Sequence, residues 1–267
     1  MWWVNGTLQS AAEGLDRGLE FGDGLFETMA LVGGRIRLLE RHLTRLEAGC
    51  ARLQLLCPDR SLLLSDLSVA AATPGAGLIK LIVTRGQGGT GYRYPASQGV
   101  CRYVTAQPQR ARPAHYVTDG IRAQWVSVRH GSQPLLAGLK HLNRLEQVLA
   151  RAQVSEDVAE GLMLDQTGHL ISGTMTNVFM VIDNRLVTPA LVHCGVAGAM
   201  RAALVDAWQA AGHAVEVRTV QPSELSVASE VFVCNALIGV WPITRLDASH
   251  WSVGPYTRQA QAWIAQW

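Results

Sequence analysis

Lysine is nearly absent from this chain of 267 residues: among its 23 lysines and arginines, only Lys80 and Lys140 are lysines. Arginine keeps its proton at any working pH and therefore cannot act as an amine nucleophile. This imbalance limits any chemistry through a side-chain amine to two candidate residues.

Net charge, long apolar runs and paired cysteines are also scarce. The formal net charge is only +2, which argues against binding to nucleic acid or to an anionic membrane surface. No apolar run reaches the roughly 18 residues of a membrane span, and the first residues lack the basic and then apolar segments of a secretion signal. The five cysteines are odd in number and include no Cys-x-x-Cys pair, so we expect reduced thiols in a cytoplasmic protein.

The motifs of several enzyme classes are missing as well. The eight histidines show no metal-ligand spacing, so we expect no bound metal. There is no Gly-x-Ser-x-Gly elbow, no P-loop and no dinucleotide fingerprint.

The residues that are present predict a mixed α/β (α+β) protein of two domains. Hydrophobic residues make up 48% of the chain, which is typical of a compact globular protein. Residues 107–120 have loop-forming composition and no periodicity, so we expect an N-terminal α/β domain over 1–110, a linker over 111–120 and a C-terminal domain over 121–267. Hydrophobic periodicity predicts helices near 38–56, 61–71, 142–153, 198–212 and from 255, and strands near 78–84, 100–106, 121–129, 160–165, 168–172, 177–182, 214–219 and 230–234, with tight turns at 5–6 and 33–34.

Lys140 follows a run of apolar residues and glycine and precedes a predicted amphipathic helix. Such surroundings remove water from the ammonium group and favour the neutral amine that a nucleophile needs. The alternative is a lysine whose stem packs on apolar surface while its charge stays in water. Lys80 lies inside a predicted strand, where alternation points it opposite to Ile79 and Leu81, and a solvated face or an acidic partner would explain it.

Two places could bind an anion. Residues 195–201 contain two glycines before a predicted helix, whose N-terminal N–H groups attract phosphate, although a plain loop has the same composition. Arg45 lies beside the apolar stripe of the first long helix and could reach a buried phosphate, or it could be a surface arginine. The glycine-rich stretches 22–24 and 85–93 form either tight turns or ligand contacts, and Arg85, Tyr92 and Arg93 would suit an anionic, ring-shaped substrate.

Taken in order, these segments resemble the fold-type IV pyridoxal-phosphate enzymes, a family of aminotransferases and lyases. The resemblance rests on residues 16–18, 21–28, 41–46, 138–147, 173–179, 195–201 and 234–237. The segment around Lys140 and residues 84–92 look most like the lyase branch.

The resemblance implies a smaller N-terminal domain, a larger C-terminal domain and pyridoxal 5'-phosphate bound at their interface. Lys140 would hold the cofactor covalently and carry protons. Family members are homodimers whose loops help to close the neighbour's site. The residues implied to hold the cofactor are Arg45, Lys140, Ser172, Ala199, Met200, Asn235 and Ala236.

Ser172 departs from the family pattern. Relatives usually carry a glutamate at this position, five residues before Asn177, which pairs with the protonated ring nitrogen of the cofactor. A hydroxyl can only hydrogen-bond to that nitrogen, so the ring would withdraw electrons less strongly. This favours a lyase, whose product is driven by aromatisation, and it also permits the alternative that the protein has lost activity.

The function that the resemblance implies is cleavage of 4-amino-4-deoxychorismate to 4-aminobenzoate and pyruvate, a step toward folate. Partners for the substrate carboxylates are expected among Thr28, Arg85, Tyr92, Arg93 and Arg144. The main alternative is an aminotransferase for D- or branched-chain amino acids on the same fold. An arginine-rich protein that binds nucleic acid or other anions is a third reading, against which the dispersed arginines and the low net charge argue.

Overall fold

The computed structural model describes residues 2–9 and 16–267, which form two compact units. The N-terminal unit comprises Met1–Arg110 together with Leu139–Asn143, and the C-terminal unit comprises Ala111–Gly138 and Arg144–Trp267. The short segment Leu139–Asn143, which contains Lys140, packs with the N-terminal unit, although the chain on both sides of it belongs to the other unit.

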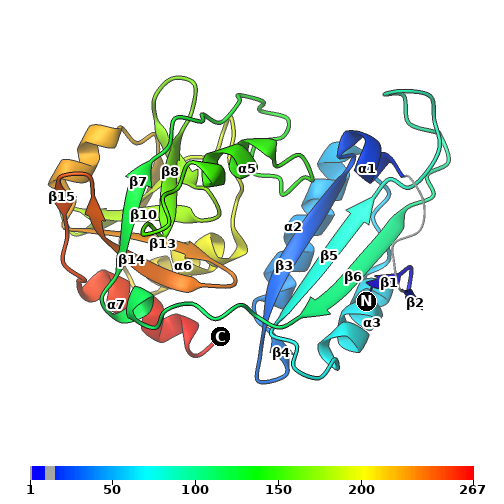
Figure 1. Cartoon of the computed structure of the whole chain (residues 1–267), viewed down its shortest axis with the longest axis horizontal. Helices are drawn as coiled ribbons and strands as arrows, with labels where there is room; N and C mark the ends of the chain where they lie inside the picture. The colour runs from blue at the N-terminus through cyan, green and yellow to red at the C-terminus, as the bar shows by residue number, and fades with distance from the viewer. Residues whose placement is uncertain (1, 10–15) are drawn as a thin grey trace. The chain divides into compact units, whose positions relative to one another are not determined.

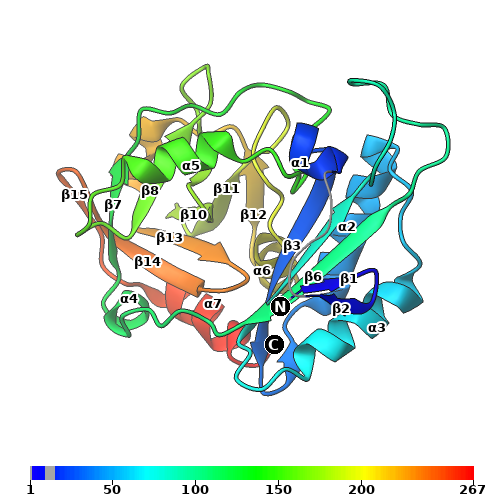
Figure 2. The ribbon, with the colours of Figure 1, turned by 45° about the vertical axis from the view of Figure 1, so that its right-hand side comes forward.

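The N-terminal unit is a six-stranded sheet with strand order β2-β1-β6-β5-β3-β4, in which every pairing is antiparallel. Helices α2 (Leu39–Leu53) and α3 (Arg60–Ala71) cover one face of this sheet (Figures 1 and 2). The short helix α1 (Arg17–Phe21) precedes the first long strand. The strands are β1 (Trp2–Val4), β2 (Thr7–Gln9), β3 (Gly24–Val32), β4 (Arg35–Ile36), β5 (Leu78–Thr84) and β6 (Cys101–Gln107).

The two faces of this sheet differ because side chains alternate along each strand. Leu25 of β3 points toward α2, since a Cβ on Gly49 of that helix would lie 2.7 Å from its Cδ1. The alternate residues Met29, Ile79 and Leu81 are fully buried on the same face. The residues between them, which include Thr28 and Lys80, are only partly buried. We refer to this second side, which α2 and α3 do not cover, as the open face.

The C-terminal unit contains a nine-stranded mixed sheet with strand order β12-β11-β10-β13-β14-β7-β8-β9, and β15 pairs with β14. Parallel pairs join β11 to β12, β14 to β7 and β7 to β8. Its core includes Trp241 and the stacked rings of Phe179 and Phe232. The strands are β7 (Ile121–Trp125), β8 (Glu160–Leu164), β9 (Leu170–Gly173), β10 (Asn177–Ile182), β11 (Arg185–Pro189), β12 (Val215–Arg218), β13 (Glu230–Asn235), β14 (Gly239–Leu246) and β15 (Ser249–His250). The helices are α4 (His115–Thr118), α5 (Leu145–Ala152), α6 (Ala199–Ala210), α7 (Pro255–Ile264) and the 3₁₀ helix η1 (Pro222–Val227).

The mixed α/β fold class is confirmed, while several predicted bounds are wrong. The predicted turn at 33–34 is present, but the strand before it, β3, begins at Gly24, inside a stretch whose glycines suggested a loop. Strands β11 and β14 were not predicted. Helix α5 begins at Leu145 instead of 142, because residues 140–142 pair with β3 instead of starting the helix.

Two expectations from composition concern the cysteines and the membrane. All five cysteines are free thiols. Among the helices of residues 2–9 and 16–267, none is long and apolar enough to cross a membrane.

Candidate active site

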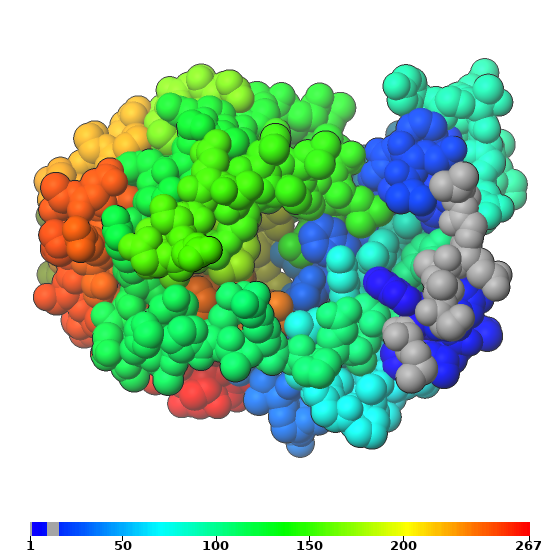
Figure 3. Space-filling model, in the orientation of Figure 1, coloured from blue at the N-terminus to red at the C-terminus, as the bar shows by residue number. Residues whose placement is uncertain are grey.

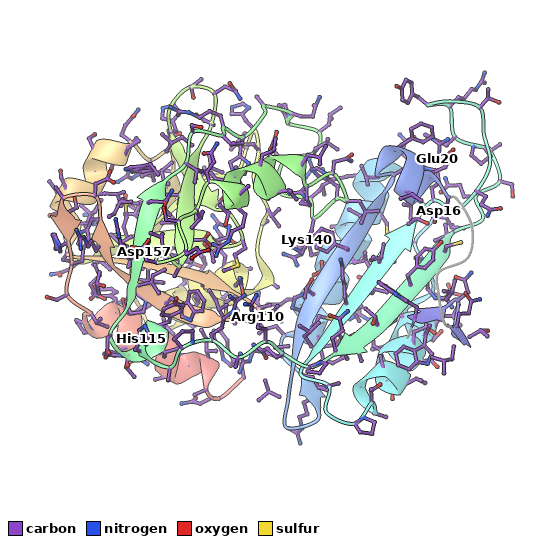
Figure 4. All side chains as sticks on the ribbon, viewed as in Figure 1. Asp16, Glu20, Arg110, His115, Lys140 and Asp157 are labelled. Atoms are coloured by element: carbon purple, nitrogen blue, oxygen red, sulfur yellow. The ribbon has the colours of Figure 1, made fainter. Side chains whose placement is uncertain are left out.

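Lys140 lies on a short extended segment that runs antiparallel to the start of β3. The Phe26 N–H donates to the Lys140 carbonyl at 2.9 Å, and the Leu142 N–H donates to the Gly24 carbonyl at 3.0 Å. Between these two bonds Leu25 stands opposite His141, so Lys140 stands opposite Phe26. Directly opposed residues of antiparallel strands project to the same side, which places the Lys140 side chain on the open face (Figure 4).

Lys80 lies on the same face and beside the same aromatic ring. The Nζ atom of Lys140 is 4.2 Å from the ring centroid of Phe26, and that of Lys80 is 5.4 Å from it. Both distances are within the range of a cation–π interaction. Thr28 stands directly opposite Lys80 in the β3–β5 pairing. The two lysines of the chain, 60 positions apart in sequence, thus meet at one ring, with the Thr28 hydroxyl on the same face.

This placement extends the prediction for Lys80. Alternation correctly set it opposite to Ile79 and Leu81. From the sequence we expected either a solvated face or an acidic partner for Lys80. That expectation included neither the aromatic ring of Phe26 nor the second lysine beside that ring. The scarcity of lysine was the one sequence signal that could have linked the two residues.

Arg45, on α2, binds a buried carboxylate within the N-terminal unit. Its Nε donates to Glu27 Oε1 at 2.8 Å, and a second guanidinium nitrogen donates to Glu27 Oε2. The His42 Nδ1 atom is 2.6 Å from the same Oε2 atom. Burial acts to raise the pKa of Glu27, but Arg45 and His42 outweigh it, and the pKa lies below its ordinary value. The pair with Glu27 fixes the guanidinium of Arg45 within the N-terminal unit.

Replacing Glu27 by glutamine is expected to destabilise the N-terminal unit by about 3 kcal/mol at pH 7, because a buried ion pair loses one partner. The folded-state pKa of Glu27 is depressed, so its contribution is fully present above the ordinary value of 4.5 and is lost as the pH falls through the folded value. Urea denaturation of both proteins over a pH series would therefore show a difference that shrinks in acid. Glu47→Gln is the matched control, since Glu47 of α2 pairs with Arg60 of α3 at the surface of the same unit and should change stability by less than about 1 kcal/mol. A constant difference down to acid pH would contradict this assignment.

Helix α6 of the C-terminal unit begins with an uncapped N-terminus. Its N-cap residue is Gly198, and no side chain accepts from the first turn. The first N–H groups of a helix have no partner within the helix, so those of Ala199 and Met200 are of the kind that attracts an anion. A Cβ on Gly198 would lie 2.1 Å from Asn177 Oδ1, and Asn177 Nδ2 donates to the Val196 carbonyl at 2.9 Å. The asparagine side chain thus fixes the loop and leaves room only for glycine.

The same loop anchors the chain that leads to Lys140. The Gly138 N–H donates to the Gly195 carbonyl, and the Ala197 N–H donates to the Gly138 carbonyl, both at 3.0 Å. These two bonds hold Gly138 to the leading loop of α6 within the C-terminal unit, and the chain passes into the N-terminal unit at the next residue, Leu139.

Asn235 shapes the turn between β13 and β14. Its Oδ1 atom accepts from the N–H groups of Leu237 and Ile238, both at 2.9 Å, and its Nδ2 donates to the Met175 carbonyl at 3.1 Å. The side chain of Asn235 is thus occupied by backbone groups. Any cofactor contact at this turn, which includes Ala236, would come from the main chain.

Ser172 and His130 form a buried pair in the C-terminal unit. Ser172 lies on β9 and is 6% exposed, and His130 is 2% exposed. The His130 Nε2 atom lies 2.9 Å from Ser172 Oγ, and His130 Nδ1 lies 3.5 Å from Glu146 Oε2. Sequence reasoning missed His130, because 42 positions separate it from Ser172 and no motif marks it.

The five expected substrate contacts fall into different environments. Arg85 is 3% exposed, and its donors are bound to Asp23 and to the carbonyls of Leu53 and Gln54, so its role is structural. Tyr92 and Arg93 lie exposed on the loop between β5 and β6, which stands out from the N-terminal unit in Figure 3.

Arg144 is the N-cap residue of α5, and burial lowers its pKa to about 10. Thr28 is the one expected contact that shares the open face of the N-terminal unit with Lys140 and Lys80. Thr28 thus lies on the same face as the two lysines, whereas Arg85 is buried and binds groups of the protein itself.

Comparison with known proteins places these features in a family. The model of the amino-transferase class IV family matches residues 24–246. The chain is 37% identical to the aminodeoxychorismate lyase of Vibrio harveyi over 98% of both chains. It is 27% identical to the D-alanine aminotransferase of Listeria monocytogenes over 94% of this chain and 89% of that protein.

Among solved structures, the crystal structure of 4-amino-4-deoxychorismate lyase from Pseudomonas aeruginosa matches with a TM-score of 0.95 and 45% identity, covering 100% of this chain and 98% of the other. The match is thus close in sequence as well as in fold. The chain belongs to the amino-transferase class IV family.

Proposed function

We propose that this protein is a pyridoxal-phosphate-dependent lyase that converts 4-amino-4-deoxychorismate to 4-aminobenzoate and pyruvate, a step toward folate. The observation that carries the proposal is the position of Lys140, one of two lysines in the chain, on the open face beside Phe26 and Lys80. The names and full-length coverage of the relatives from Vibrio harveyi and Pseudomonas aeruginosa support the choice of a lyase.

The residues present fit pyridoxal phosphate. The N–H groups of Ala199 and Met200 at the uncapped start of α6 suit its phosphate, and Gly198 is a position that a Cβ would fill. Arg45 adds a guanidinium, and Asn235 and Ala236 add the turn after β13. The cofactor supplies an aldehyde that joins an amine and a ring that withdraws electrons.

Lys140 has two tasks in the proposed reaction. It holds the cofactor through its side-chain nitrogen, and its Nζ atom as a free amine takes the proton from the substrate ring. The C–O bond then breaks and the ring becomes aromatic; the enolpyruvate that leaves regains one proton, equal to the one taken from the ring, and becomes pyruvate. The Lys80 ammonium and the Thr28 hydroxyl lie on the same face and can donate to a substrate carboxylate.

We propose further that the protein is a cytoplasmic homodimer. Helix α5 exposes the apolar side chains of Leu145, Val148 and Leu149, at 76%, 59% and 59%. Apolar residues grouped in this way on a helix suit an interface with another protein chain. In a dimer the exposed Tyr92 and Arg93 would be available to the neighbouring copy, and the five free thiols suit a reducing compartment.

The experiment that tests the function uses purified protein reconstituted with pyridoxal phosphate. Incubation with 4-amino-4-deoxychorismate should release 4-aminobenzoate, followed by its fluorescence, and pyruvate, followed by a coupled assay, in equal amounts. A parallel incubation with D-alanine or a branched-chain amino acid and a keto acid measures amino transfer. Amino transfer without pyruvate release from 4-amino-4-deoxychorismate would replace the lyase with an aminotransferase.

A further inference from the structure

The hydrogen bonds around Ser172 determine which atom carries each proton. The Ser172 hydroxyl donates its single proton to the Gly173 carbonyl at 2.9 Å. The 2.9 Å contact between Ser172 Oγ and His130 Nε2 must then use a proton on the histidine. The structure therefore assigns the Nε2–H form to His130, which donates into one lone pair of the serine oxygen.

The charged groups around His130 act in opposite directions. Burial lowers the pKa of His130, and Arg144 adds to this effect, whereas Glu146 and Asp165 act to raise it. Glu146 faces Nδ1 from α5, and Asp165 follows β8, where its carboxylate accepts from Thr167 and His169. Burial predominates, so at neutral pH the imidazole is uncharged, and Glu146 is the group placed to hold the proton that Nδ1 takes up in acid.

Ser172 occupies the position at which the resemblance to fold-type IV enzymes implies a carboxylate on the ring nitrogen of the cofactor. We propose that His130 is a positioning residue that acts through Ser172: its Nε2–H occupies one lone pair of the serine oxygen, so that the hydroxyl presents its proton to the ring nitrogen. This inference rests on the proposed function, because it needs pyridoxal phosphate bound with its ring nitrogen at Ser172.

The Ser172–His130 pair affects the protonation of the ring nitrogen differently from a glutamate. A carboxylate only accepts, so it stabilises a protonated ring nitrogen, whereas a hydroxyl turned away from Gly173 donates and favours an unprotonated one. The Ser172 hydroxyl can rotate so that its proton points to the ring nitrogen instead of the Gly173 carbonyl. Its oxygen keeps the hydrogen bond from His130 during this rotation. We therefore expect the ring nitrogen to be unprotonated at neutral pH and to respond when His130 gains a proton in acid.

The test uses the reconstituted protein with pyridoxal phosphate labelled with ¹⁵N in the ring, followed by ¹⁵N NMR and visible absorption over a pH series. The wild-type ring nitrogen should resonate as an unprotonated, hydrogen-bonded nitrogen, with an inflection on the acid side. His130→Gln keeps an N–H donor without a titrating group and should keep the neutral-pH signal but lose the inflection. His130→Leu and Ser172→Ala should both move the signal to that of a pyridine nitrogen without a hydrogen bond.

Two variants serve as references. Ser172→Glu should give a protonated ring nitrogen, which fixes the other end of the scale. His250→Gln changes an exposed histidine whose ring Nδ1 contacts the Ala248 carbonyl, and this variant should give the same pH profile of the ring nitrogen as the wild type. If His130→Leu fails to fold, Ser172→Ala still tests whether the Ser172 hydroxyl is the donor to the ring nitrogen, and His130→Gln still tests the response to pH.

The outcomes separate this inference from the proposed function. A wild-type pH profile in His130→Gln, or a protonated ring nitrogen in the wild type at neutral pH, overturns the role of His130 while leaving the lyase activity in place. A wild-type protein that gains no visible absorption band with pyridoxal phosphate overturns the proposed function itself.

Discussion

Replacing Lys140 by arginine is expected to abolish the visible absorption band of the reconstituted protein and to lower kcat/KM for 4-aminobenzoate formation by about 10⁴-fold. Arginine keeps the positive charge and the N–H donors beside Phe26, so the electrostatics of the open face change little. What is lost is an amine that can join an aldehyde and carry a proton. The measurement is the absorption spectrum after addition of pyridoxal phosphate, followed by steady-state assays.

Lys80→Arg is the matched control for this prediction. Lys80 is the other lysine of the chain, and its Nζ lies at 5.4 Å from the same ring. If Lys140 forms the covalent bond, Lys80→Arg keeps the visible band, although KM can rise because arginine presents its charge to a carboxylate differently. A band that disappears in Lys80→Arg and persists in Lys140→Arg would make Lys80 the covalent lysine and would contradict the assignment.

The placement of these lysines shows which kind of inference the sequence supports. Alternation along the strand set Lys80 opposite to Ile79 and Leu81, because the two-residue period of a strand is a local property. The position of Lys140 depends on the pairing of residues 140–142 with β3, in which its partner Phe26 lies 114 positions earlier in the sequence. No local pattern reports such a contact. The sequence therefore singled out Lys140 as a candidate but could not indicate its neighbours.

Arg85 illustrates the opposite error. In sequence it stands beside a glycine-rich stretch, which suggested a contact with an anionic substrate. In the structure its donors bind Asp23 and two backbone carbonyls at the C-terminal end of α2, and its guanidinium lies over the ring of Tyr94 at 4.1 Å. An arginine that satisfies carbonyls beyond a helix end looks the same in sequence as one that waits for a ligand, because only the fold decides what faces it.

The Ser172 position combines a local signal with a non-local one. The resemblance to the fold-type IV family indicated that a hydroxyl replaces a carboxylate, because the family usually has a glutamate five residues before the asparagine that is Asn177 here. It could not indicate that His130 and Glu146 stand behind that hydroxyl, since these residues come from the loop after β7 and from α5. The chemistry expected of Ser172 therefore changed from that of an isolated serine to that of a serine whose oxygen is already bound by a histidine.

Replacing Gly198 by alanine is expected to weaken binding of pyridoxal phosphate and to lower kcat/KM by about a hundredfold, which is the scale of a misplacement near 1 Å at a binding site. The new Cβ would lie 2.1 Å from Asn177 Oδ1 and 3.3 Å from its Cγ. The carboxamide would have to turn away, which breaks its 2.9 Å bond to the Val196 carbonyl and releases the loop that leads into α6. The measurement is a titration of the apoprotein with pyridoxal phosphate, together with the assay for 4-aminobenzoate.

Gly99→Ala is the control for this substitution, since a Cβ at Gly99 would meet nothing within 4 Å. It should leave cofactor affinity unchanged. The clash with Asn177 has a sharper test in the double variant Gly198→Ala with Asn177→Ala, which removes the oxygen that the new methyl group would strike. If the clash is the cause, the double variant binds pyridoxal phosphate as well as Asn177→Ala alone, because the two changes act on one contact and are not additive. Losses that simply add would mean that Gly198 is needed for a reason other than the space taken by Asn177.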